Sequence, residues 1–189
     1  MEPQTLIITN IREQARDTRS FDLKPQGISG HHGLSFSPGQ VAILRVAGDE
    51  QGYFAFASAP DDTDLEVLVK QKIGASKIIF DMAPGQSIEL TGIAGHGFDL
   101  SEQKKRDLVF VAMGTGVAPL RSALRHVLKR KNDYGQLVVL YGARTPDDFC
   151  YRDEVDAWAE KGVELRQVIS RPDGHVLVGS WTTPVDSWK

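Results

Sequence analysis

Residues 107–119 have the sequence Asp-Leu-Val-Phe-Val-Ala-Met-Gly-Thr-Gly-Val-Ala-Pro, and this stretch decides the fold of the second half of the chain. From Asp107 to Met113 the residues form a nearly continuous apolar run, which is typical of a strand buried on both faces of a parallel sheet. A glycine turn follows at 114–116, and a basic amphipathic pattern then continues to about Arg130. The stretch therefore predicts a strand, a tight turn and a helix in direct succession, which is the start of a βαβ unit.

Strand and helix patterns continue to alternate beyond this unit. Leu137–Tyr141 and Val163–Ile169 predict two further strands, and Asp153–Lys161 predicts the helix between them. Alternation at this spacing is typical of a parallel α/β domain. We count three parallel strands in this half of the chain.

The first hundred residues have a different pattern, in which short extended runs are separated by turn residues. Six such runs at roughly even spacing predict a small antiparallel barrel or sandwich. The runs are Thr5–Ile11, Arg19–Lys24, Val41–Val46, Tyr53–Ala57, Leu65–Val69 and Ser87–Thr91. One short helix is expected at Ala75–Met82. A polar, charged segment at 101–106 then separates two predicted domains, residues 1–102 and residues 103–189.

Composition and charge exclude several classes of protein. The 189 residues are 41% hydrophobic and 25% charged, which is ordinary for a globular chain. The net charge of −3, without a dense Lys/Arg stripe, argues against nucleic-acid binding. No stretch reaches the ~18 apolar residues of a membrane span and no secretory signal is recognisable, so we expect a soluble, cytoplasmic protein, with an organellar location after removal of a transit peptide left open. A single cysteine, Cys150, excludes an internal disulfide and a four-thiolate metal site, and we expect no metal.

Three motifs carry further information, namely YFAFASAP at 53–60, LVKQKIGAS at 68–76 and GTGVAP at 114–119. A Gly-x-Gly turn alone is often purely conformational. In this order and spacing, however, the three motifs resemble the ferredoxin–NADP reductase-like family of flavoproteins, from about residue 5 to Pro172. The resemblance implies a two-domain β plus α/β protein. Its parts would be a six-stranded antiparallel Greek-key barrel that binds FAD (residues 1–102) and a parallel Rossmann-like domain that binds NAD(P)H (residues 103–189).

The resemblance also assigns residues to each cofactor. The FAD site would comprise Phe54, Ala55, Phe56, Ala57, Ser58, Val69, Lys70, Gly74, Ala75 and Ser76, with Lys72 as a further cation. The nicotinamide nucleotide would contact Gly114, Thr115, Gly116, Val117, Pro119, Gly142 and Arg144. Free N–H groups at a helix N-terminus suit a diphosphate in both places. We name no catalytic side chain, because the cofactors carry the reactive atoms in this chemistry. A simple core role for Phe54 and Phe56 stays open.

Two departures from the family pattern affect the functional prediction. Gly52, Phe54 and Ala55 stand where the family has arginine, tyrosine and serine, so a charge-assisted contact worth about 1.5–3 kcal/mol is missing. Family members also continue with at least one more βα unit, so the second domain is expected to be incomplete and the strand at Leu108–Ala112 to have an open edge. We expect truncation, coverage by Val176–Trp181, or completion by a partner chain.

The leading prediction is an NAD(P)H-dependent flavin oxidoreductase that transfers a hydride from NAD(P)H to FAD and electrons onward to an unknown acceptor protein. The alternative is a partial FAD-binding or electron-transfer module that lacks a nicotinamide site of its own or needs a second subunit. A flavin-free scaffold is a third possibility. The choice between NADH and NADPH stays open, because Arg144 favours a 2′-phosphate whereas Asp147 and Asp148 beside it would repel one.

Overall fold

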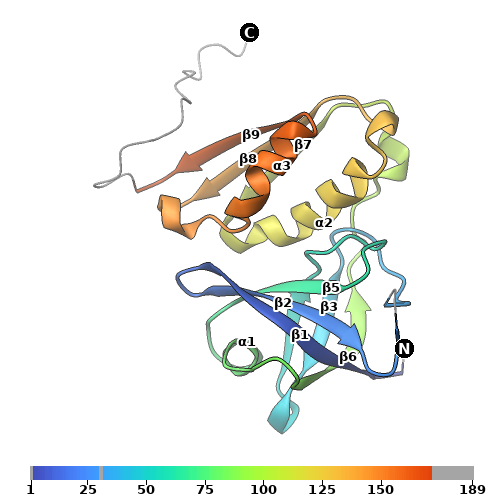
Figure 1. Cartoon of the computed structure of the whole chain (residues 1–189), viewed down its shortest axis with the longest axis vertical. Coiled ribbons are helices and arrows are strands. Elements are labelled where there is room, and N and C mark those ends of the chain that lie inside the picture. Colours follow the sequence, from blue (N-terminus) through green and yellow to red (C-terminus); the bar gives the residue numbers. More distant parts are fainter. Residues whose placement is uncertain (1, 30–31, 172–189) are drawn as a thin grey trace.

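Six antiparallel strands form the N-terminal part of the molecule (Figure 1). The computed structural model describes residues 2–29 and 32–171. The strands are β1 (Gln4–Ala15), β2 (Thr18–Pro25), β3 (Val41–Arg45), β4 (Gln51–Ala55), β5 (Leu65–Lys70) and β6 (Ser87–Ala94). They lie in the order β4-β3-β6-β1-β2-β5, and a bridge between Phe56 and Val67 joins the two ends of the sheet. The sheet is therefore closed, which confirms the predicted barrel.

Alternation of side chains places the barrel core. Leu6 and Ile8 on β1 and Phe21 and Leu23 on β2 are fully buried, whereas the residues between them are more exposed. This period of two is what a half-buried strand requires. The short helix α1 (Ala75–Phe80) packs against β4 and β5, and its Ile79 side chain joins the same core.

Three parallel strands form the C-terminal sheet in the order β7-β8-β9. Their bounds are β7 (Leu108–Met113), β8 (Leu137–Ala143) and β9 (Val163–Ile169). The helices α2 (Val117–Leu128) and α3 (Val155–Glu160) connect successive strands, and α2 lies between the sheet and the barrel (Figure 1). These elements confirm the predicted parallel α/β architecture. None of the helices in the described part of the chain is long and apolar enough to cross a membrane.

One prediction about β7 is wrong within the described residues. The apolar run was expected to be buried on both faces, but only Phe110 and Ala112 are buried. Val109, Val111 and Met113 are 60%, 66% and 77% exposed. The physical reason is that these three alternate with the two buried residues, whose side of the sheet is covered by α2.

The expected open edge of the sheet is also present, since β7 pairs only with β8 among residues 2–29 and 32–171. The segment Val176–Trp181, which was one expected cover for that edge, lies outside the described residues. Six short 3₁₀ turns lie among the described residues, and the proposed domain boundary between residues 102 and 103 falls within the turn at Ser101–Gln103. They are η1 (Ala47–Asp49), η2 (Ser101–Gln103), η3 (Gly114–Gly116), η4 (Lys131–Asp133), η5 (Pro146–Asp148) and η6 (Arg152–Glu154).

Candidate cofactor-binding site

Two adjoining cavities lie where the barrel meets the C-terminal sheet. The first, which we call the barrel cavity, has a volume of about 290 Å³ and is lined mainly by β4, the end of β5 and the start of α1. The second, the strand-end cavity, has about 310 Å³ and lies at the carboxyl ends of β7 and β8. Lys70 and Thr115 line both cavities. The two cavities are therefore neighbours with a shared wall.

The barrel cavity brings together five of the residues predicted to hold FAD. They are Phe54, Lys70, Gly74, Ala75 and Ser76, and the further predicted cation, Lys72, lines the cavity as well. Thr115, predicted to contact the other cofactor, joins them from the C-terminal part. Gly74 precedes α1 with φ of 62°, a conformation that glycine adopts without strain.

The direction of β4 side chains was not foreseen. Phe54 lies opposite the buried Ala42 of β3, and directly opposed residues in an antiparallel pair share a face of the sheet. Its ring therefore belongs to the barrel core and is only 8% exposed at the cavity wall. Gly52 leaves room for this ring, since a Cβ there would lie 2.6 Å from Phe54 Cε2. The neighbouring Tyr53 is 69% exposed and lines the cavity. Alternation along the strand was the signal that could have identified Tyr53.

Four other predicted flavin residues, and Ala55 with them, do not line the barrel cavity. The four, which are buried, are Phe56, Ala57, Ser58 and Val69. Phe56 stacks on Phe36 with ring centroids 4.1 Å apart, and the Ser58 hydroxyl accepts a hydrogen bond of 2.9 Å from the Glu66 N–H. Their side chains have structural roles. Contact of these residues with FAD through their backbone groups stays a prediction.

The strand-end cavity contains four of the residues predicted for the nicotinamide nucleotide, namely Gly114, Thr115, Gly142 and Arg144. The Tyr141 hydroxyl supports the turn by donating a 3.1 Å hydrogen bond to the Gly114 carbonyl. Ligands of open α/β sheets bind at the carboxyl ends of strands, as here. The other three predicted residues, Gly116, Val117 and Pro119, do not line the cavity. Val117 is in the core at 1% exposure.

Most charges around the two cavities are already paired. Lys70 Nζ lies 3.2 Å from a carboxylate oxygen of Asp17, and Arg144 Nε lies 3.3 Å from a carboxylate oxygen of Asp148. Burial acts to raise the pKa of Asp148, but hydrogen bonds from Thr145 and the pairing with Arg144 outweigh it and lower that pKa. Arg144 is therefore partly neutralised by its own neighbour.

Cys150 lines the strand-end cavity with a buried thiol. Burial is the main cause that raises its pKa to about 11, so the thiol is neutral near pH 7. The peptide N–H of Cys150 donates a 3.0 Å hydrogen bond to the Tyr141 hydroxyl. The sequence did not predict that Cys150 lines a cavity, because the residue lies on a loop whose position no local pattern specifies.

The barrel cavity fits a dinucleotide diphosphate in part. The backbone at Gly74–Ser76 leaves space for a close approach, and the Lys72 side chain also lines the cavity. Against this, Glu50 Oε2 lies only 3.1 Å from the position that a Cβ on Gly74 would occupy. No arginine is among the described residues that line the cavity. The shape and the lysine favour an anion there, whereas Glu50 opposes it.

Comparisons with known proteins agree with this geometry. Residues 110–175 match the family model of the oxidoreductase NAD-binding domain. The chain is 35% identical over 146 residues to ferredoxin–NADP reductase B of Sorangium cellulosum, covering 74% of this chain and 59% of the relative. It is 34% identical over 153 residues to the reductase component of propane 2-monooxygenase of Rhodococcus jostii, covering 78% of this chain and 40% of the relative.

The fold is shared with solved reductase structures. The flavohaem-like FAD/NAD-binding domain of nitric oxide dioxygenase from Vibrio cholerae superposes with a TM-score of 0.77 at 18% identity, covering 90% of this chain and 76% of that chain. The chain spans about half the length of the curated relatives that it matches. The barrel and the parallel sheet give the chain the fold of the ferredoxin–NADP reductases, and the matched NAD-binding domain and these relatives support a ferredoxin–NADP reductase-like oxidoreductase.

Proposed function

We propose that this chain binds FAD in the barrel cavity and NAD(P)H in the strand-end cavity, and that it is an NAD(P)H-dependent electron-transfer reductase. The observation that carries the proposal is the shared wall of the two cavities at Lys70 and Thr115. A hydride can pass between two bound cofactors only when they are held in contact and in the right orientation. Adjoining cavities on two parts of one chain support such an arrangement.

Bound FAD would supply the chemistry of hydride acceptance from NAD(P)H and of electron transfer to an acceptor. The residues of this chain bind, orient and shield the cofactors. The backbone at Gly74–Ser76 and the ammonium group of Lys72, which line the barrel cavity, would hold the diphosphate of FAD. The η3 turn and Gly142 leave space for close approach of the second cofactor. Tyr53 offers an exposed aromatic ring at the cavity wall.

The electron acceptor is proposed to be a partner protein. Relatives of this chain are named as reductase or electron transfer components of propane 2-monooxygenase and toluate 1,2-dioxygenase, and such components act by passing electrons to another protein. The hydride-transfer reaction itself, the division at residues 102 and 103 and the cytoplasmic location are parts of the same proposal.

The test is an anaerobic titration of the full chain. We expect added FAD to bind and its visible band to bleach with NADH or NADPH. Gly74→Ala should weaken FAD binding, because a Cβ there meets Glu50 and enters the cavity. Gly85→Ala is a matched control, since its φ of 89° brings similar strain with no atom within 4 Å. Bound flavin that stays oxidised with both donors would contradict the proposal and favour the partial FAD-binding module.

A further inference from the structure

A single buried guanidinium joins the two halves of the molecule. Arg121 projects from α2 and is only 5% exposed, although it is charged. On the barrel side its Nη1 donates hydrogen bonds of 2.8 Å to the Ala57 carbonyl and 2.9 Å to the Glu66 carboxylate. On its own side its Nε donates to Glu154 at 3.0 Å. Nη2 also donates to Glu154, so all three nitrogens of the guanidinium group form hydrogen bonds.

The contacts require an arginine in particular. A planar guanidinium can meet Glu154 with Nε and Nη2 while Nη1 reaches across to the barrel, whereas a lysine ammonium is a single point charge. The face of the group lies 4.3 Å from the centre of the Tyr151 ring. A charge buried to this extent is tolerated only when it is paired and hydrogen-bonded.

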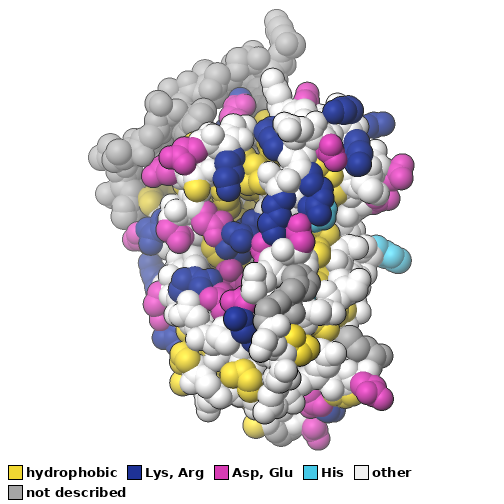
Figure 2. All heavy atoms as spheres, turned by 45° about the vertical axis from the view of Figure 1, so that its right-hand side comes forward, with side chains coloured by type: hydrophobic (Ala, Val, Ile, Leu, Met, Phe, Trp, Pro, Cys, Tyr) yellow, Lys and Arg dark blue, Asp and Glu magenta, His cyan; other side chains and the backbone are white. Residues whose placement is uncertain are grey.

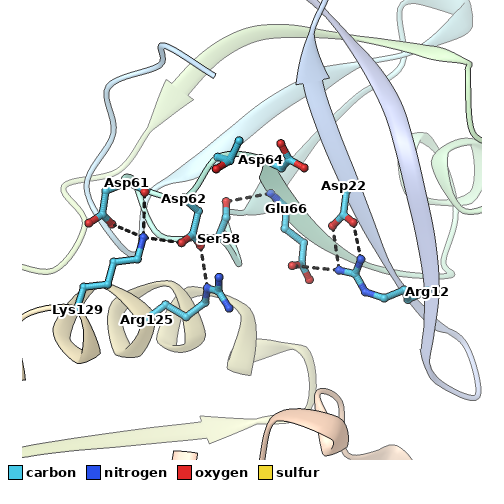
Figure 3. Close-up of a pocket in the computed structure, with 10 residues that line it drawn as sticks. Arg12, Asp22, Ser58, Asp61, Asp62, Asp64, Glu66, Arg125 and Lys129 are labelled. Atoms are coloured by element: carbon cyan, nitrogen blue, oxygen red, sulfur yellow. Dashed lines mark hydrogen bonds and ion pairs between the residues drawn. The ribbon is translucent and has the colours of Figure 1, made fainter. Parts of the chain in front are cut away.

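The barrel side of this contact is itself held in place. Figure 3 shows Glu66 between Ser58 and Arg12. The Glu66 N–H donates to the Ser58 hydroxyl, and the Glu66 carboxylate lies 3.2 Å from Arg12 Nη2. Arg12 also pairs with Asp22 of β2. Arg121 therefore meets a fixed carboxylate and does not depend on a free side chain.

Arg121 connects two segments of the chain, each of which directly follows an element that lines one of the two cavities. Ala57, whose carbonyl it binds, is two residues beyond β4, the strand that lines the barrel cavity. Arg121 lies in the second turn of α2, the helix that directly follows the Gly114–Gly116 turn of the strand-end cavity. One side chain thus ties the segment that follows the strand of one cavity to the helix that follows the turn of the other.

A second set of ion pairs crosses the same boundary but faces solvent. Acidic and basic side chains mix across the middle of the molecule in Figure 2. Arg125 of α2 and Lys129, the residue directly after α2, each approach Asp62 of the barrel to 2.8 Å. Both basic side chains are 36–40% exposed, so salt and water weaken their pairing. They offer a matched comparison for the buried Arg121.

We propose that Arg121 is a positioning residue, which holds the C-terminal part at the angle to the barrel that makes the two cavities adjoin. Its importance for hydride transfer rests on the proposed function, but its effect on the angle does not. A small misplacement of two reacting groups can lower a rate by about 100-fold. Loss of Arg121 should therefore affect the transfer step more than the binding of either cofactor.

The first test measures the angle directly, without cofactors. Spin labels would be attached in a Cys150→Ser background at Ser87→Cys in the barrel and at Glu160→Cys in the C-terminal part, which are both exposed positions. Pulsed electron paramagnetic resonance would then report the distance between the barrel and the C-terminal part. We expect a narrow distribution for the parent and for Arg125→Met, and a broadened or shifted one for Arg121→Met. Arg121→Lys, which keeps the charge, should broaden the distance distribution less than Arg121→Met. If Arg121→Met does not fold, Arg121→Lys takes its place in the test. An unchanged distribution in both Arg121 variants would overturn the proposal.

The second test is kinetic. In the anaerobic reduction of bound FAD, Arg121→Met should slow the transfer step about 10- to 100-fold and weaken the long-wavelength flavin–nicotinamide charge-transfer band. The dissociation constants of FAD and NAD(P)H should change by less than about threefold, and Arg125→Met should leave the rate within about twofold. A loss confined to cofactor affinity would contradict a positioning role. A broadened distance distribution in a chain whose parent never reduces flavin would instead sink the proposed function and leave the positioning role standing.

Discussion

Replacement of Glu50 by glutamine should tighten the binding of FAD. The Glu50 carboxylate lies at the barrel cavity, with Oε2 3.1 Å from the Cβ position of Gly74, at the start of α1. Two unit charges 4 Å apart in water interact by about 1 kcal/mol, and salt reduces this value for exposed groups. We therefore expect about 1 kcal/mol, or about a fivefold lower FAD dissociation constant, for Glu50→Gln.

The assay is a titration of the chain with FAD followed by flavin fluorescence quenching, at low and at high salt. Asp49→Asn is the matched control, because it removes the same charge one residue earlier at a position that does not line the barrel cavity. Its effect should stay below about twofold. The gain from Glu50→Gln should shrink at 1 M salt, where screening is strong. Equal affinities for the parent, Glu50→Gln and Asp49→Asn at low salt would refute the placement of the diphosphate beside Gly74.

Three further outcomes are expected. Burial acts to raise the pKa of Asp62, but hydrogen bonds from Arg125, Lys129 and the Ala59 N–H outweigh burial and lower that pKa to about 2. The stability that the Asp62 carboxylate contributes is therefore present above pH ~4 and lost between pH ~4 and ~2. Asp62→Asn should therefore lower the free energy of unfolding by about 2 kcal/mol at pH 7 and by almost nothing at pH 2, as urea titrations would show; a constant difference would contradict this. The Cys150 thiol, whose pKa burial raises to about 11, should react with Ellman's reagent at pH 8 only after unfolding, and prompt reaction of the native chain would show that the thiol is accessible. Asp148→Asn should release Arg144 and raise the ratio of kcat/KM for NADPH over NADH about three- to tenfold, and an unchanged ratio would exclude Arg144 from contact with the 2′-phosphate.

Local sequence determined the elements of this protein. The apolar run before Gly114, the glycine turn and the basic helix after it are short-range patterns, and each formed at the predicted residues. All six predicted strands of the barrel are present as well, although β1 extends to Ala15 where Ile11 was the predicted end, and β4 covers Gln51–Ala55 where Tyr53–Ala57 was predicted. Buried and more exposed side chains alternate on β3, whereas β5 is buried along almost its whole length. The motifs pointed to Gly74 and Thr115 as cofactor contacts, and both residues line the barrel cavity, although their contact with a cofactor stays a prediction.

Side-chain direction within an element was harder to predict. Phe54 was assigned to the flavin by its motif, yet its pairing with Ala42 turns the ring into the barrel and leaves Tyr53 at the cavity wall. The run at 108–113 was apolar enough for two buried faces, but α2 covers one face only, that of Phe110 and Ala112. Whether an apolar residue is buried depends on its neighbours in space, which the run itself does not specify.

Only the tertiary structure decided how the two cavities are held together. Arg121 looks in the sequence like one more basic residue of an amphipathic helix, and its partners Ala57 and Glu66 lie 64 and 55 residues earlier in the chain. Sequence alone could find the pair of Arg144 and Asp148, since they are only four residues apart. Distant partners are chosen by the packing of whole elements, and a buried charge acquires its hydrogen-bond partners only when that packing closes around it.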